Sequence, residues 1–144
     1  MGHGQGETAR PIWAKIRMSR EAILSPDAPK PVSAYSQAIR DGALLFLAGQ
    51  IPLDPVTGQM VTGDLAAETD RIILNMSAVL NAAGASLANV VKTTVYLTNM
   101  ADFPAFNAAY SRHFVSVPPA RTTVAVTALP LGARVEIEAI ATLP

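Results

Sequence analysis

DLAAETDRIILNMSAVLNAAGASLANVVKTTVYL, residues 64–97, decides the fold, because a helical period is followed within it by a strand. Asp64 is a favourable N-cap residue, and apolar residues then recur at 3.6-residue spacing as far as Ala83. Gly84 suits the position just after a helix. Residues 90–97 are rich in β-branched and aromatic side chains, which predicts a strand. A helix followed by a strand predicts a crossover within one sheet.

A hairpin is predicted before this stretch. Asp41-Gly42 is a strong short-range hairpin pattern, and the segments 35–40 and 43–50 flank it. Residues 51–58 are mostly turn formers, and the prolines among them exclude a central strand there.

The chain after residue 97 repeats the order of helix and strand. Aromatic residues recur at helical spacing over 102–114, which predicts a second helix that the prolines at 118–119 end. The last two strands are predicted at 121–127 and 134–142. The predicted order is therefore ββαβαββ. It corresponds to an α+β fold in which two helices cover one face of a single sheet.

Length and composition indicate one domain. A chain of 144 residues can bury a core of its own, and we expect this domain to span 18–144. Residues 1–17 show no periodic pattern, and we expect them to form a flexible N-terminal extension. Half of the residues are apolar and only 15% are charged, which excludes a disordered chain. The same balance favours burial of the open sheet face against copies of the chain.

Charge and residue content also exclude several classes of function. Eleven basic and eleven acidic side chains cancel, so the chain has no net charge to attract nucleic acid or an anionic membrane. The absence of cysteine excludes a disulfide framework, and the two histidines, His3 and His113, are too few for a metal cluster. The longest apolar run, 43–48, is too short to span a membrane, and the N-terminus lacks the apolar region of a signal peptide. We therefore expect a soluble cytoplasmic protein without a metal cluster.

Arg121 is the first candidate site residue. It follows a proline turn at the start of a predicted strand, where its planar fork of donors suits a carboxylate. The alternative is a solvated edge-strand arginine that deters aggregation, and position alone favours this alternative.

Glu136 and Glu138 alternate with apolar residues, so both point to one face of the last strand. A glutamate on a half-buried face can activate water, because desolvation raises its pKa. The alternative is a solvated face or an ion pair with Lys92 or Arg134, and the sequence by itself favours that alternative.

Other polar groups give weaker indications. Tyr35, Asn107 and the backbone around Gly49 lie within apolar segments, where each suits either a ligand contact or an ordinary cap, core or turn role. Lys92 lies within a predicted strand and is either a Schiff-base lysine or a lysine that reaches the surface. The sequence contains no phosphate-binding glycine motif, and its residues do not assemble into a nucleophile–His–Asp set.

Six motifs together resemble the Rid family, also called the YjgF family. In chain order they are AYSQA (34–38), AGQIPLDPVTG (48–58), NAAGAS (81–86), VKTTVYL (91–97), PPART (118–122) and VEIEAIA (135–141). The resemblance covers about 18–143, almost the whole chain. It implies a chorismate-mutase-like (YjgF-type) α+β fold and a homotrimer whose sheets form an inner barrel, with ligand sites between neighbouring subunits.

The resemblance also implies an activity. Members similar to the RidA branch act in the repair of metabolite damage. They hydrolyse reactive enamines and imines such as 2-aminoacrylate to 2-keto acids and ammonia, without a cofactor. Matched motif by motif, Arg121 is expected to hold the substrate carboxylate and Glu136 to position or activate water. Tyr35, Gly49 and Asn107 are expected to contact the substrate.

Two expected substrate-binding positions depart from the best-known family pattern. Ala48 stands where serine is frequent before the glycine, which removes a hydroxyl that would bind the imine or water. Thr123 stands where cysteine or serine is frequent, and it keeps a hydroxyl.

Two other functions remain open. The first is a non-catalytic or chaperone-like trimer that binds a keto acid or related metabolite in the same cleft, which Ala48 favours. The second is the RNA cleavage associated with similar proteins of the endoribonuclease L-PSP type. Zero net charge and the lack of a basic–aromatic strip argue against RNA cleavage.

Overall fold

The computed structural model describes residue 11 and residues 20–144. The expected flexible extension at 1–17 therefore lies, apart from residue 11, outside the described residues. Six strands form one sheet, and their bounds are β1 Glu21–Ile23, β2 Ala38–Asp41, β3 Leu44–Gln50, β4 Val90–Leu97, β5 Ala120–Ala125 and β6 Val135–Thr142. Their order across the sheet is β1-β2-β3-β6-β4-β5. Only the β4–β5 pair is parallel, and the other neighbouring strands are antiparallel.

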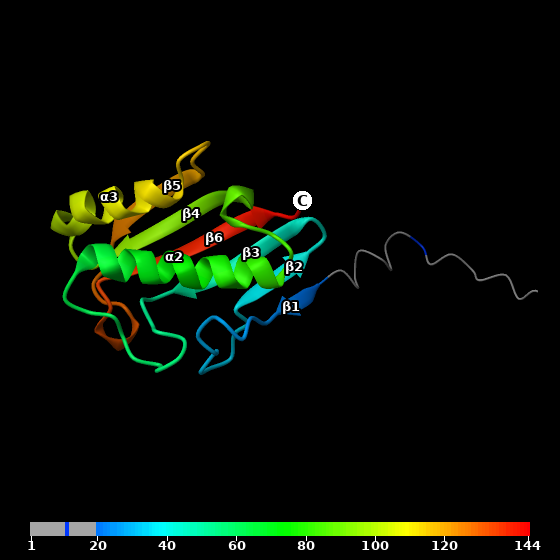
Figure 1. Cartoon of the computed structure of the whole chain (residues 1–144), viewed down its shortest axis with the longest axis horizontal. Coiled ribbons are helices and arrows are strands. Elements are labelled where there is room, and N and C mark those ends of the chain that lie inside the picture. The colour runs from blue at the N-terminus through cyan, green and yellow to red at the C-terminus, as the bar shows by residue number, and fades with distance from the viewer. Residues whose placement is uncertain (1–10, 12–19) are drawn as a thin grey trace, which may run out of the picture.

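Two α-helices lie on the same side of this sheet (Figure 1), α2 (Leu65–Ala82) and α3 (Phe103–His113). Three short 3₁₀ helices, η1 (Leu87–Asn89), η2 (Met100–Asp102) and η3 (Pro130–Gly132), lie in the connections. The predicted α+β fold is confirmed, and the other face of the sheet carries no helix of the described chain.

The α2 helix forms where the sequence predicts it. The Asp64 side chain accepts a hydrogen bond from the backbone N–H of Ala66 at 3.1 Å, which satisfies one of the free donors of the first turn. Ile72, Ile73 and Met76 face the sheet and are fully buried. After the helix, Gly84 has a φ of +77°, a conformation that favours glycine.

The strand β1 is an addition to the predicted order. It pairs with β2, and the chain between them is held by the buried side-chain amide of Gln37. Gln37 Oε1 accepts from the Ser25 backbone N–H at 2.6 Å, and Gln37 Nε2 donates to the backbone carbonyls of Ser25 and Pro29. These contacts explain why β2 begins at Ala38 rather than at residue 35.

A buried ion pair joins the helical layer to the start of β6. Glu68 of α2 is 2% exposed, and both of its carboxylate oxygens accept hydrogen bonds from the Arg134 guanidinium. Arg134 therefore fixes the chain between η3 and β6 against α2. This contact excludes the predicted alternative in which Arg134 pairs with a glutamate of β6.

The open face of the sheet, the face without helices, is largely apolar. Alternation along β6 buries Val135 and Ile137 under the helices and turns Glu136 and Glu138 to the open face, as predicted. Large apolar side chains that remain about 40% exposed lie on the same face, namely Leu44, Phe46 and Val124. No α-helix of the described residues is long and apolar enough to cross a membrane.

Candidate active site

Arg121 lies at the start of the edge strand β5 and is held by side chains of α3. Its Nη1 donates to Asn107 Oδ1 at 2.8 Å. The guanidinium carbon lies 4.8 Å from the centre of the Tyr110 ring and 5.3 Å from that of Phe103, so the cation packs against two aromatic rings. We call these four residues the arginine cluster.

Thr93 of the neighbouring strand β4 packs beneath the arginine cluster. Arg121 pairs in register with Thr93 of β4, and the Thr93 and Tyr110 hydroxyls are 2.8 Å apart in a buried hydrogen bond. Burial raises the pKa of Tyr110, and the Thr93 hydrogen bond and the Arg121 charge partly oppose this rise. Tyr110 therefore stays a neutral ring beneath the guanidinium.

The Arg121 guanidinium of the arginine cluster has hydrogen-bond donors left to bind an anion. Among the described residues, Arg121 forms no ion pair with a carboxylate. It borders a cavity of about 340 Å³ with Asn107, Tyr110 and the prolines at 118–119. Thr123 lies two residues along β5, and its buried Oγ1 has no hydrogen-bond partner among the described residues. The arrangement suits a carboxylate, which binds the guanidinium through two parallel hydrogen bonds.

Glu136 lines a second cavity, of about 490 Å³, which we call the glutamate cavity. Tyr35, Ala48 and Gly49 line it too, so four predicted site residues are brought together here. Pairing between β3 and β6 is interrupted between Leu47 and Gln50. Ala48 and Gly49 lie in this interruption, and Gly49 packs against the Glu136 carboxyl with no room for a side chain.

The two glutamates of β6 have different surroundings. Glu138 accepts a hydrogen bond from the Tyr96 hydroxyl at 2.5 Å, which with burial raises the pKa of Tyr96 to about 12. Glu136 forms neither a hydrogen bond nor an ion pair through its side chain with any described residue. Burial raises the pKa of Glu136, and repulsion by Glu138 adds to this rise. Glu136 is thus the glutamate that can exchange a proton with a bound molecule.

Lys92 forms neither an ion pair nor a hydrogen bond with Glu136 or Glu138. Its Nζ donates to the Thr93 carbonyl at 2.9 Å and to the Thr122 hydroxyl at 3.2 Å. His113 pairs with Asp70 of α2 at 2.8 Å, which makes it a contact between the two helices. No group of three metal-ligating side chains occurs among residues 20–144.

Arg121 and Glu136 point to opposite faces of the sheet. Arg121 lies opposite Thr93, which points into the core, and Glu136 lies opposite Tyr96 on the open face. The two positions are also separated by roughly 10 Å along the strands and by two strand spacings of about 4.8 Å each. One chain therefore does not bring these two groups to a single small substrate.

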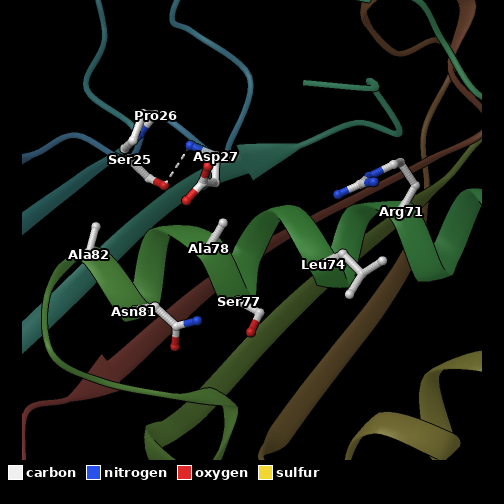
Figure 2. Close-up of a pocket in the computed structure, with 9 residues that line it drawn as sticks. All are labelled: Ser25, Pro26, Asp27, Arg71, Leu74, Ser77, Ala78, Asn81 and Ala82. Atoms are coloured by element: carbon white, nitrogen blue, oxygen red, sulfur yellow. Dashed lines mark hydrogen bonds between the residues drawn. The ribbon is translucent and has the colours of Figure 1, made fainter. Parts of the chain in front are cut away.

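A third cavity, of about 530 Å³, lies between the outer surface of α2 and the loop 25–27 (Figure 2). Asp27 and Arg71 are its charged residues, and Arg71 donates to Asn75 at 3.2 Å. None of the predicted site residues lies there.

The sequence pattern does not reveal that aromatic side chains of α3 form part of the site. Phe103 and Tyr110 belong to the aromatic stripe that predicts the second helix, and in the structure they also pack against the Arg121 guanidinium. Their spacing from Asn107 could have indicated this role. Phe103 lies four positions before Asn107 and Tyr110 lies three after it, so the three side chains share one face of the helix.

Comparison with known proteins identifies the family. A family model described as Endoribonuclease L-PSP matches residues 25–143. The chain belongs to this family, the YjgF/Rid family. Protein DfrA of Myxococcus xanthus is 50% identical to this Rid protein over 87% of this chain and 97% of its own length. The 2-iminobutanoate/2-iminopropanoate deaminase of Dermatophagoides farinae is 45% identical over 85% of this chain and 97% of its own length.

Solved structures agree with the fold of this Rid protein. The crystal structure of RidA from the Antarctic bacterium Psychrobacter superimposes with a TM-score of 0.83 at 38% identity, over 86% of this chain and the whole of that chain. The predicted family and fold are therefore confirmed, and some relatives of the chain are named as imine deaminases.

Proposed function

We propose that this Rid protein hydrolyses 2-imino acids, and the enamines in equilibrium with them, to 2-keto acids and ammonia. The observation that carries the proposal is the pair of complementary half-sites, an unpaired arginine on aromatic rings and an unpaired glutamate in a cavity. The name of the Dermatophagoides relative supports the same reaction class. Each half-site lacks what the other supplies.

The complete site forms between two copies of the chain. Because Arg121 and Glu136 lie on opposite faces of one sheet, the Arg121 of one copy must meet the Glu136 of its neighbour. Head-to-tail contacts of this kind form a closed ring when the rotation between neighbouring copies closes. We assign the ring as a trimer in which the apolar open faces pack together around Phe46 and Val124.

Arg121 binds the substrate carboxylate. Asn107 occupies one nitrogen of the guanidinium, and Arg121, with N–H donors left over, lines the cavity beside α3. A charge-assisted hydrogen bond of this kind contributes about 1.5–3 kcal/mol. The Thr123 hydroxyl is buried without a partner among the described residues and does not line this cavity, so no contact with the substrate is assigned to it.

Glu136 handles the protons of hydrolysis. As a carboxylate it takes a proton from water while the water oxygen bonds to the iminium carbon and the C=N electron pair moves to nitrogen. It then returns this proton to the amino group of the adduct. The C–N bond breaks, the hydroxyl oxygen forms the keto group, and the hydroxyl proton leaves with ammonia as ammonium. A raised pKa suits both proton transfers near neutral pH.

A metabolite-binding trimer without turnover is the second candidate. Ala48 favours it, because a serine in its place would add a hydroxyl to the glutamate cavity. The two functions share one site and differ in whether bound imine is turned over faster than in water.

Mixing two inactive variants tests the proposed site. A serine or threonine dehydratase supplies the imine, and formation of 2-keto acid above the spontaneous rate is measured. Arg121→Ala and Glu136→Gln are each expected to be inactive. When they are co-expressed, one site in about four combines an intact arginine with an intact glutamate, so about a quarter of the wild-type activity returns. A mixture as inactive as its components rules out a site shared between copies. No turnover by the wild type overturns the proposed function and favours metabolite binding.

A further inference from the structure

Leu131 has an unusual backbone conformation. Its φ of 55° and ψ of 25° lie in the left-handed region, and among the described residues no other non-glycine residue has a positive φ. A side chain is disfavoured in this conformation because Cβ crowds the following carbonyl. A glycine would remove the cost, so the leucine side chain itself is the feature that needs an explanation.

The Leu131 side chain lines the glutamate cavity. It is 73% exposed, and Val32, which is 90% exposed, lines the same cavity. Ile51 and Pro130 extend this apolar wall. Glu136 is the sole charged residue among the described residues that line the cavity, and none of them is cationic. An unusual backbone therefore carries an exposed apolar group beside the proposed proton acceptor.

The remaining part of the substrate meets this wall. With the carboxylate on Arg121 and the imine carbon near Glu136, the third substituent of that carbon is the side chain of the parent amino acid. An apolar side chain buries its surface against Leu131. An acidic side chain faces Glu136 without a cation to offset the repulsion.

We propose that Leu131 is a specificity-determining residue that selects 2-imino acids with apolar side chains of three or four carbons. This inference rests on the proposed function. The cavity of about 490 Å³ lies within the ordinary range for small-molecule sites, so a branched side chain has room beside the reacting group.

Amino acid oxidases provide the test, since with oxygen they convert leucine, alanine and glutamate to the matching imino acids and hydrogen peroxide, which catalase removes. The wild type is expected to show a kcat/KM for the leucine-derived imine at least about tenfold above that for the glutamate-derived imine. Leu131→Asn keeps the size of the side chain and tolerates the left-handed conformation. It is expected to lower kcat/KM about tenfold for the leucine-derived imine and less than about threefold for the alanine-derived imine.

Three controls make the result specific. Leu131→Gly removes the side chain without backbone strain and should reproduce the selective loss. Leu131→Met should retain the preference for the leucine-derived imine, since it remains apolar. Leu74→Asn makes the same chemical change at an exposed leucine of α2 outside both half-sites (Figure 2), and it should leave the ratio of the two kcat/KM values unchanged.

An unchanged leucine-to-alanine ratio in the folded asparagine and glycine variants overturns the inference. If the wild type hydrolyses none of the imines, the proposed function fails. Calorimetry then tests the role of Leu131 separately, by measuring the affinities for 4-methyl-2-oxopentanoate and for pyruvate. A preference of the wild type for the larger keto acid that Leu131→Asn abolishes supports the role of Leu131. Equal affinities for the two keto acids overturn it.

Discussion

Gly49 lies so close to Glu136 that a Cβ on residue 49 would be 2.9 Å from the Glu136 carboxyl carbon and 3.1 Å from its Oε1. Real Cβ atoms do not approach other atoms so closely, so a side chain at position 49 must displace the carboxyl group. The bulge in β3 and the glutamate of β6 are thus fitted to each other.

Gly49→Ala is expected to lower stability by about 1 kcal/mol or less, because the Glu136 carboxyl that the new methyl group meets is the end of a flexible side chain beside a cavity and can turn away. In a Glu136→Ala background the same change should cost close to nothing, because the atoms it meets are gone. Chemical denaturation of the four proteins in this cycle measures the coupling. Equal costs in the two backgrounds would show that the glycine does not accommodate Glu136.

Arg121→Ala should reduce deamination by at least about a hundredfold, because it removes the charged contact and the orientation of the substrate. The oligomeric state should stay that of the wild type. Arg112→Ala is the matched control, since Arg112 is an exposed arginine of α3 that pairs with Asp70 instead. Wild-type turnover by Arg121→Ala would refute the assignment of the carboxylate site.

The pH dependence of kcat/KM tests the role of Glu136. The folded chain raises the pKa of Glu136 above its ordinary value of 4.5, and the base must be a carboxylate. Activity should therefore fall as the pH drops through this raised pKa, which places the acidic limb above pH 4.5. Glu136→Gln should be slow at every pH and lack this limb, while it still binds a keto acid. A limb that persists in Glu136→Gln belongs to another group.

Phe46→Glu tests the assembly. Phe46 is 42% exposed in the single chain and lies on the apolar open face, where a charge would oppose burial against a second copy. Sedimentation should show dissociation, and activity should disappear with the shared sites. Leu74→Glu places the same charge on the outer surface of α2, where Leu74 is 51% exposed, and should leave the assembly intact. An assembled Phe46→Glu protein would exclude the open face as the interface.

Arg134→Met should destabilise the fold by about 2 kcal/mol, because it leaves the buried Glu68 carboxylate without its partner. The value lies below that of a fully buried pair, since the Arg134 side chain is 41% exposed. Replacing both residues, as Glu68→Gln with Arg134→Met, should recover part of the loss in denaturation experiments. A single variant as stable as the wild type would mean that the carboxylate finds other partners.

Local patterns were sufficient to predict most of the fold. The α2 helix, the hairpin after Ala38 and the alternation along β6 each follow from residues adjacent in sequence. The strand β1 did not, because three residues carry too little pattern. Its position depends on Gln37, twelve residues after Ser25, whose side-chain contacts no local period reveals.

The sequence predicts which residues belong to the candidate site, but it does not predict on which face of the sheet each of them lies. Arg121 lies against Asn107, and Tyr35, Ala48, Gly49 and Glu136 line one cavity, while their roles toward a substrate stay predictions. Arg121 and Glu136 lie on different faces because of the register of β4 against β5 and against β6. The pattern within a single strand does not show that register. The sequence pattern does not reveal Leu131 either, since its backbone conformation is set by the loop as a whole.

The placement of Arg121 and Glu136 on opposite sides of one sheet also bears on how such a protein diversifies. In the proposed ring, one copy of a duplicated gene can lose Arg121 and the other can lose Glu136, and mixed rings would still contain sites that combine both residues. Each gene copy is then free to drift in the half it no longer supplies, so that heteromeric enzymes arise without any new fold.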